Sequence, residues 1–111
     1  MGQTMTGQET IRRIRETDLS RFQEYLKQEE RACATRIRYQ HDLNLFVQYL
    51  KREDALMEVT KERVIGFKEH LLMQYQIRSV NSMLTAVNCF LGWMGWPECR
   101  VPLSSTPPLL L

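Results

Sequence analysis

Side chains suited to binding a ligand gather at the start of one apolar stretch in the last third of the sequence. A guanidinium, two hydroxyls and an amide follow one another closely there, at Arg78, Ser79, Asn81 and Ser82. Such groups, set beside the free N–H groups of a helix N-terminus, form a grip for a phosphate. The spacing therefore predicts an anion-binding helix start with Ser79 as its N-cap.

The apolar stretch behind these side chains has the period of an α-helix. Its apolar residues recur at three- and four-residue steps, at Val80, Met83, Leu84, Val87, Phe90, Leu91 and Met94. Gly92, Gly95 and Pro97 come next, and residues of these types continue a helix poorly. The pattern predicts one amphipathic helix that closes a small core and points its polar start outward.

Three further helices are predicted upstream from the same apolar spacing. The first covers about Leu19–Glu30 with Asp18 as its N-cap, and the second covers about Thr35–Lys51. The third follows a predicted N-cap at Thr60 and ends near Tyr75. No stretch has the alternation of a strand, so we expect an all-α fold.

Composition limits the class of protein. The chain has 111 residues, of which 43% are hydrophobic and 25% charged, so we expect one ordinary globular domain. A net charge of +2 is too small to indicate a nucleic-acid partner by itself, and any basic face must come from the distribution of charge. The segment 31–52 has such a bias, because it holds five Lys or Arg and one Asp.

The cysteines and the hydropathy exclude several other classes. Three widely spaced cysteines make neither a disulfide framework nor a metal knuckle, and Cys89 is expected to be a small core residue. No apolar run has the length of a membrane span, and the first residues lack a signal-peptide core. We expect a cytoplasmic protein without a bound metal or cofactor and without a membrane partner.

Both ends of the chain carry weaker patterns than the middle. Residues 1–17 are either a flexible leader or include a short helix over about Gln8–Glu16, and both interpretations stay open. The prolines in residues 98–111 predict an extended or disordered tail. Residues 18–97 are therefore expected to form the domain. Within it the acidic connection 53–59 is not expected to face a phosphate.

Four sequence pieces, in this order and with these gaps, resemble the N-terminal core-binding (SAM-like) domain of tyrosine recombinases, the phage-integrase family. The pieces are F-x-x-Y-L at 22–26, T-x-x-x-Y-x-x-D-L-x-x-F at 35–46, V-T-x-x-x-V-x-x-F at 59–67 and R-S-V-N-S-M-L-T-A-V-N-x-F at 78–90. The resemblance covers about residues 18–96. It implies a compact four-helix orthogonal bundle that packs on one face of duplex DNA, while a catalytic domain covers the opposite face.

In that family the DNA contacts cluster on the second and fourth helices. Carried over by position, the contacts would be Thr35, Arg36, Arg38 and Tyr39, then Arg78, Ser79, Asn81, Ser82 and Thr85. The residue types fit phosphate positioning, because arginines supply charge and forked donors while hydroxyls add short neutral ones. Competing structural roles stay open: Tyr39 could be a core residue, and Thr35 and Ser79 could be plain helix caps.

The family's reaction chemistry is not expected in this chain. The resemblance implies a tyrosine nucleophile and transition-state stabilising side chains that belong to a C-terminal domain, and only fifteen residues follow Trp96. His41 and His70 lie in separate predicted helices without a nucleophile or ligand set. We therefore predict a non-catalytic DNA-binding module, with duplex DNA and other recombinase subunits on it as partners and no small-molecule substrate. The alternative is a protein-interaction module that uses Trp93, Trp96 and the Met-bearing fourth helix.

Overall fold

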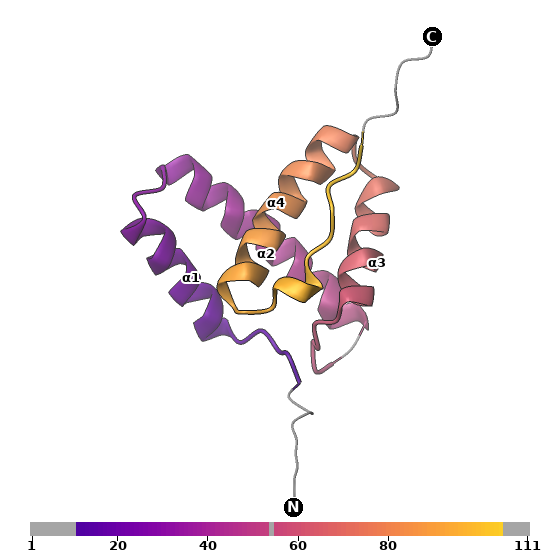
Figure 1. Ribbon diagram of the computed structural model, residues 1–111, viewed down its shortest axis with the longest axis horizontal. Helices are drawn as coiled ribbons and strands as arrows, with labels where there is room; N and C mark the ends of the chain where they lie inside the picture. The colour runs from indigo at the N-terminus through magenta and orange to yellow at the C-terminus, as the bar shows by residue number, and fades with distance from the viewer. Residues whose placement is uncertain (1–10, 54, 106–111) are drawn as a thin grey trace, which may run out of the picture.

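Four α-helices make up most of the chain in this computed structural model, which describes residues 11–53 and 55–105 (Figure 1). They are α1 (Glu16–Gln28), α2 (Cys33–Glu53), α3 (Lys61–Leu72) and α4 (Ile77–Trp93), and a 3-10 turn, η2 (Pro97–Cys99), follows. The described residues contain no strand, only an isolated bridge between Arg13 and Glu58. The all-α, four-helix prediction is confirmed.

The N-caps of α3 and α1 can be compared with the predicted ones. Thr60 is the N-cap of α3 as predicted, since its hydroxyl accepts a hydrogen bond from the Arg63 N–H at 3.1 Å. Asp18, predicted as the N-cap of α1, instead lies within the first turn, and Arg15 is the N-cap. The Asp18 carboxylate reaches back to accept from the Arg15 backbone N–H at 2.9 Å. An acidic residue suits either position, so sequence alone did not separate them.

Helix α2 starts two residues earlier than predicted, and the N-cap of α4 lies three residues earlier than predicted. Helix α4 begins at Ile77 after Gln76, so Ser79 is not its N-cap. Helix α2 begins at Cys33, which places Thr35 inside the first turn rather than at the cap. Neither the Gln76 side chain nor an acidic first turn marks the start of α4. A helix start without a capping side chain leaves little sequence signal, because water or the backbone satisfies its free N–H groups.

The helix ends also differ slightly from the prediction. Helix α1 ends at Gln28, and Glu30 behind it has a φ of 60°, in the left-handed region. Helix α3 ends at Leu72, three residues before Tyr75. These differences amount to a few residues. The apolar period predicts where a helix lies, whereas local capping decides the exact residue at which it ends.

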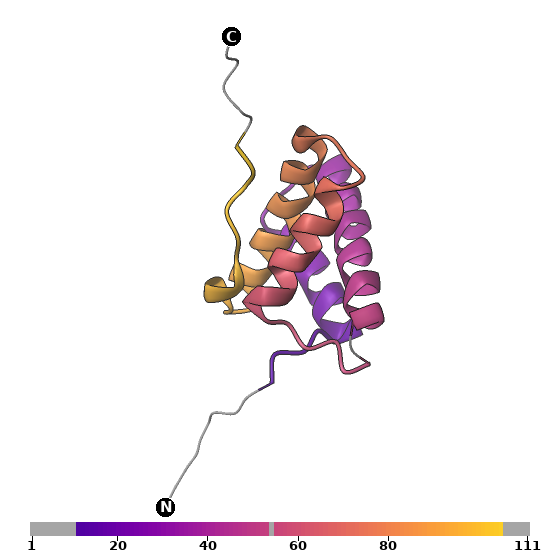
Figure 2. The same ribbon diagram turned by 90° about the vertical axis from the view of Figure 1, so that its right-hand side faces the viewer.

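The core lies where α2 and α4 cross, with α1 and α3 packed on either side (Figures 1 and 2). Two aromatic clusters join the helices in pairs. Phe22 of α1 packs edge-on against Phe90 of α4 with ring centroids 5.2 Å apart. Phe46 of α2 packs against Phe67 of α3 with ring centroids 5.0 Å apart. All four phenylalanines are among the fully buried side chains, so the predicted apolar faces do form the core.

Gly66 of α3 lies in close contact with Tyr49 of α2. A Cβ at this position would lie 2.6 Å from the Tyr49 hydroxyl oxygen. Cys89 is half-buried against the core, whereas Cys99 of η2 is the buried cysteine. The burial of Cys99 was not expected, because the sequence after α4 has no apolar period.

The two ends of the described chain have definite structures. Residues 11–15 are not helical, and the Val59 N–H donates to the Arg12 carbonyl at 2.7 Å. Residues 8–10 of the possible leader helix lie outside the described residues. After η2 the chain runs in extended form beside α4, and Val101 is buried (Figure 2). The rest of the predicted tail, residues 106–111, also lies outside the described part.

Candidate nucleic-acid interface

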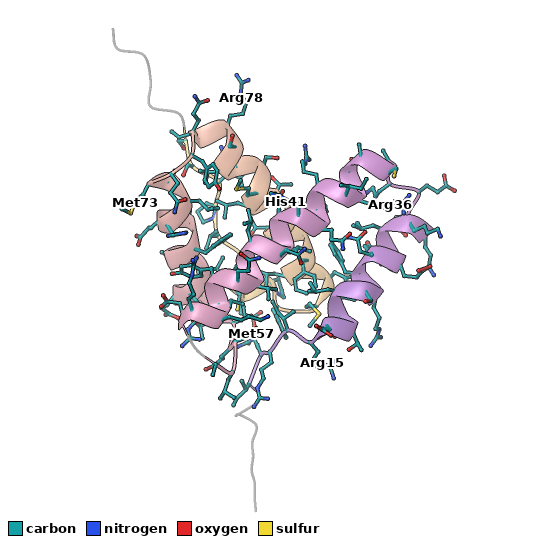
Figure 3. All side chains as sticks on the ribbon, turned by 180° about the vertical axis from the view of Figure 1, so that it is seen from behind. Arg15, Arg36, His41, Met57, Met73 and Arg78 are labelled. Carbon is teal, nitrogen blue, oxygen red and sulfur yellow. The ribbon has the colours of Figure 1, made fainter. Side chains whose placement is uncertain are left out.

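The beginnings of α2 and α4 lie at the same edge of the molecule. The two helices cross, and both views of the ribbon place their first turns at the upper edge (Figures 1 and 2). Seen from behind, Arg36 and Arg78 mark the two beginnings, and His41 lies between them (Figure 3). The beginnings therefore share a side of the bundle but are separated from each other, because the helices diverge from their crossing point.

On α2 the four predicted contact residues divide between surface and core. Arg38 is exposed, Thr35 and Arg36 are half-buried, and Tyr39 is only 5% exposed. The Arg38 guanidinium carbon lies 6.0 Å from the centroid of the Tyr39 ring, within the range of a cation–π contact. The structure favours the core interpretation of Tyr39, with its ring beneath the arginine that faces solvent.

Arg36 is tied to the neighbouring helix α1. Its backbone carbonyl accepts a hydrogen bond from the Gln23 side-chain amide at 3.3 Å. Its Nε is buried and has no hydrogen-bond partner among the described residues. Part of this side chain therefore packs at the α1–α2 contact, so Arg38 is the more accessible of the two predicted α2 arginines.

On α4 the predicted residues also divide. Arg78, Ser79 and Thr85 are exposed and Ser82 is half-buried. The Thr85 hydroxyl donates to the backbone carbonyl of Asn81 at 2.8 Å, so its proton is used within the helix. Arg78, Ser79 and Ser82 remain as accessible donors of the first turns, the group that the sequence had singled out.

Asn81 is engaged by the chain that follows the helices. Its side-chain amide donates to the Ser104 carbonyl at 2.9 Å, and its side-chain oxygen accepts from the Ser104 N–H at 2.7 Å. Both functional groups of the amide are therefore occupied. Reading a base edge with Asn81 would require this pair to open.

Three accessible arginines supply positive charge at this edge. Arg31, Arg38 and Arg78 are exposed, and no carboxylate of the described residues lies within ion-pair distance of them. Two exposed acids, Glu29 and Glu30, directly precede Arg31 in the turn before α2. Their charge offsets that of Arg31 more than that of Arg38 or Arg78, so the two helix-borne arginines are the main positive groups of the edge.

His41 and Asp42 form a pair near the middle of this edge that sequence reasoning passed over. His41 Nδ1 lies 3.4 Å from Asp42 Oδ1, with the histidine side chain 68% exposed and the carboxylate 5% exposed. Burial raises the pKa of Asp42, and the hydrogen bond from His41 and the charge of Arg38 offset this only in part. Neighbouring positions on a helix point in different directions, so only the packing shows which of the two faces solvent.

The tryptophans that the alternative function would use are not free surface groups. Trp93 and Trp96 are both half-buried and pack against the core. The Trp93 ring centroid lies 5.3 Å from that of Phe22. Met83 and Met94 also pack against the core. These side chains close the bundle, which removes the observation that would have favoured a protein-interaction groove.

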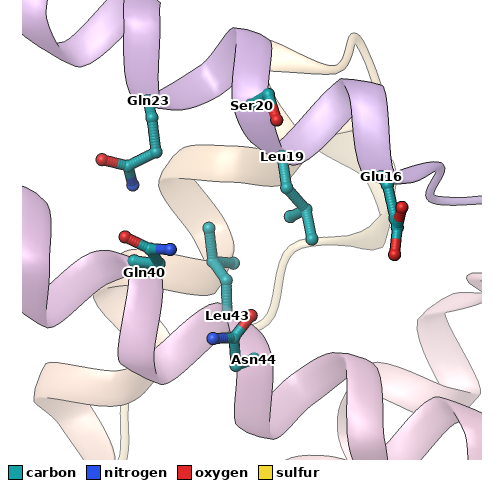
Figure 4. Close-up of a pocket in the computed structure, with 7 residues that line it drawn as sticks. All are labelled: Glu16, Leu19, Ser20, Gln23, Gln40, Leu43 and Asn44. Atoms are coloured by element: carbon teal, nitrogen blue, oxygen red, sulfur yellow. The ribbon is translucent and has the colours of Figure 1, made fainter.

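A groove of about 420 Å³ lies between α1 and α2 (Figure 4). Its lining is mostly uncharged, with a single carboxylate, and consists of Glu16, Leu19, Ser20, Gln23, Gln40, Leu43 and Asn44. In the described part of the chain, no three His, Cys, Asp or Glu side chains are placed to hold a metal ion. Each helix in the described part of the chain is too short or too polar to span a bilayer.

A protein-family model matches most of the chain. The model of the phage integrase N-terminal SAM-like domain matches residues 7–96 of the 111-residue chain. No curated protein and no solved structure matches the chain. The match covers the four helices together with the connections between them.

Proposed function

Because the chain belongs to the family of phage integrase N-terminal SAM-like domains, we propose that it is the DNA-binding module of a site-specific tyrosine recombinase or integrase. In this function the beginnings of α2 and α4 bind the backbone of duplex DNA. They hold the DNA for a catalytic domain that the matched segment does not include. The observation that supports it most is that Arg38 and Arg78, on two helix beginnings at one edge, are both exposed and form no ion pair with a described carboxylate.

Each helix beginning contributes a different set of donors. Arg38 supplies a charged fork from the second turn of α2, and Arg78 supplies another from the first turn of α4. Ser79 adds a short neutral donor, and the free N–H groups of the α4 start add a partial positive charge. Such groups position a duplex by its phosphates and carry no direct sequence information.

The proposed binding is mainly electrostatic, so it depends on salt. Each phosphate that a cation neutralises contributes about −0.9 to the slope of log affinity against log salt concentration. Two unpaired arginines therefore predict a modest slope and weak affinity for the isolated domain. Their separation along the edge means that they contact different phosphates rather than one.

The test compares the two arginines of this edge with an arginine at the far end of α2. Arg38→Ala and Arg78→Ala are each expected to weaken binding to a duplex at low salt and to reduce the salt slope by about 0.9. Arg52→Ala is the matched control, because it removes the same charge from the exposed far end of α2. Affinity is measured by fluorescence anisotropy over a salt series, and thermal melting checks the fold.

Two outcomes would contradict the proposed function. One is the absence of measurable binding at low salt by a folded wild-type protein. The other is an equal loss of affinity in Arg52→Ala and Arg38→Ala, which would show attraction by overall charge rather than by the edge that carries the two helix beginnings.

A further inference from the structure

The extended segment after η2 is held on α4 by two asparagines that pair with its backbone. We call residues 100–105 the strap. The Asn88 amide donates to the Val101 carbonyl at 2.8 Å and accepts from the Val101 N–H at 3.1 Å. Asn81 makes the same two bonds with Ser104, at 2.9 and 2.7 Å. Each asparagine thus binds one residue of the strap as a neighbouring β-strand would.

The spacing of the two pairs explains why both form at once. Asn81 and Asn88 are seven residues apart on a helix, which is about 10.5 Å along its axis at 1.5 Å per residue. Val101 and Ser104 are three residues apart in an extended chain, which is about 10 Å. The strap runs antiparallel to α4, so the two lengths match and the bonds involve only its backbone.

A cation of α3 also binds the strap. The Lys68 ammonium donates to the Pro102 carbonyl at 2.6 Å. None of the described carboxylates lies within ion-pair distance of Lys68. A backbone carbonyl is a neutral acceptor, and an ammonium binds an ionised acceptor such as a phosphate oxygen more strongly. The strap therefore occupies a lysine whose charge remains uncompensated.

The outer part of the strap is held mainly by these polar bonds. Val101 is 4% exposed and belongs to the core, whereas Leu103 is 46% exposed and Pro102 is also exposed. The Lys68 bond to Pro102 is exposed and the two Asn81 bonds to Ser104 are half-buried, and the net gain from each such bond is small. Residues 102–105 can therefore leave α4 without opening the core.

We propose that the face of α3 and α4 beneath the strap, with Lys68 and Asn81, is a second phosphate-binding surface that duplex DNA reaches when the strap detaches. This inference rests on the proposed function and enlarges its site. Asn81 lies one turn beyond Arg78, so the covered surface continues the α4 beginning. The strap and the DNA backbone would compete for the same donors.

The test uses two shortened chains, both with an amidated C-terminus so that neither places a new carboxylate beside Lys68. A chain ending at Val101 loses the outer strap but keeps every buried core residue of the described structure, while a chain ending at Ser105 keeps the strap. The shorter chain is expected to bind a duplex more tightly, with a salt slope steeper by about 0.9 for one added phosphate contact. Its advantage should then shrink about 3.5-fold between 50 and 200 mM salt.

Lys68→Ala completes the comparison in both chains. It is expected to abolish the gain in the chain ending at Val101 and to leave the affinity of the chain ending at Ser105 unchanged. In the full chain, Ser104→Pro removes the N–H from which the Asn81 side-chain oxygen accepts a hydrogen bond. This variant is expected to bind a duplex more tightly than the full wild-type chain. This variant decides the matter if the shorter chain fails to fold.

Failure of this inference differs from failure of the proposed function. If the chain ending at Ser105 binds through Arg78 but removal of the outer strap or Ser104→Pro leaves affinity equal or lower, the strap is a structural clamp and the inference is overturned. If no folded variant binds a duplex at low salt, the proposed function itself fails.

Discussion

Replacing Asp42 with asparagine is expected to stabilise this protein at neutral pH. The carboxylate is buried, its Oδ2 atom has no hydrogen-bond partner among the described residues, and Oδ1 has only a long contact of 3.4 Å with His41 Nδ1. Burial raises the pKa of Asp42 above its usual value. A buried charge with so little compensation disfavours the folded state, and asparagine removes the charge without changing the shape.

The sign of the pH dependence follows from the raised pKa. The folded protein holds the Asp42 proton more tightly than the unfolded chain, so ionisation of Asp42 lowers stability as pH rises from the unfolded pKa through the folded one. A buried acceptor without a partner disfavours folding by about 1–3 kcal/mol. Because asparagine still places a polar group there, we expect a gain near the lower end, about 1 kcal/mol, or roughly 4–8 °C in melting temperature.

Asp18 provides the matched control, because its side chain is equally buried but well paired. It accepts from Arg15 Nε at 3.2 Å, Arg15 Nη2 at 3.1 Å and the Arg15 backbone N–H at 2.9 Å. Burial alone would raise the pKa of Asp18, but the bonds from Arg15 outweigh it and the pKa is lowered. Its stabilising effect is present above the unfolded pKa and is lost as pH falls through the lowered pKa.

The assay is thermal unfolding of wild type, Asp42→Asn and Asp18→Asn from pH 7 downward. Asp42→Asn should melt above wild type at pH 7, with the difference disappearing as wild-type Asp42 takes up its proton. Asp18→Asn should melt below wild type, by an amount typical of a lost helix-start bond, about 0.5–2 kcal/mol. A destabilised Asp42→Asn at pH 7 would refute the reasoning, because it would show that the Asp42 charge has a stabilising partner.

Two further predictions test the packing. Phe90→Ala should lower the free energy of unfolding by about 3–5 kcal/mol, because it leaves a cavity beside Phe22. Denaturant unfolding measures this loss, and a loss below about 1 kcal/mol would place Phe90 outside the core. Gly66→Ala should stabilise the protein by up to about 1 kcal/mol in a Tyr49→Phe background, because alanine favours a helix more than glycine does. With the Tyr49 hydroxyl present the new methyl group has no room, so no gain is expected. Equal effects in both backgrounds would contradict the close contact.

The helices themselves were predictable because their signals are local. The apolar period reports which face of each helix is buried, and the four fully buried phenylalanines fall on the predicted faces. Thr60 was predicted correctly as a cap, because a threonine just before a helix can accept a hydrogen bond from the backbone N–H three residues later, as its hydroxyl does from Arg63. Asp18 and Ser79 were wrongly predicted as caps, since polar residues of these types also suit the first turn. The true N-cap of α4, Gln76, makes no side-chain capping bond and so gives no comparable sequence signal.

The predicted contact residues show where local signals end. The sequence singled out Arg78 and Ser79, and both are accessible because polar residues at a helix start tend to face solvent. It left both a core role and a contact role open for Tyr39, and the packing decides that Tyr39 is covered while Arg38 faces solvent. The buried Asp42 beside the exposed His41 depends on the same packing.

The sequence by itself determined the all-α class, the positions of the four helices and the polar residues at their starts, since each depends on residues within a few positions of one another. Only the tertiary structure decided that the α2 and α4 beginnings share an edge, and that Asn81 binds Ser104 across 23 residues of chain. The physical reason is that such contacts depend on how the helices cross. That crossing is fixed by the fit of all the buried side chains together, and no single segment of the chain specifies it.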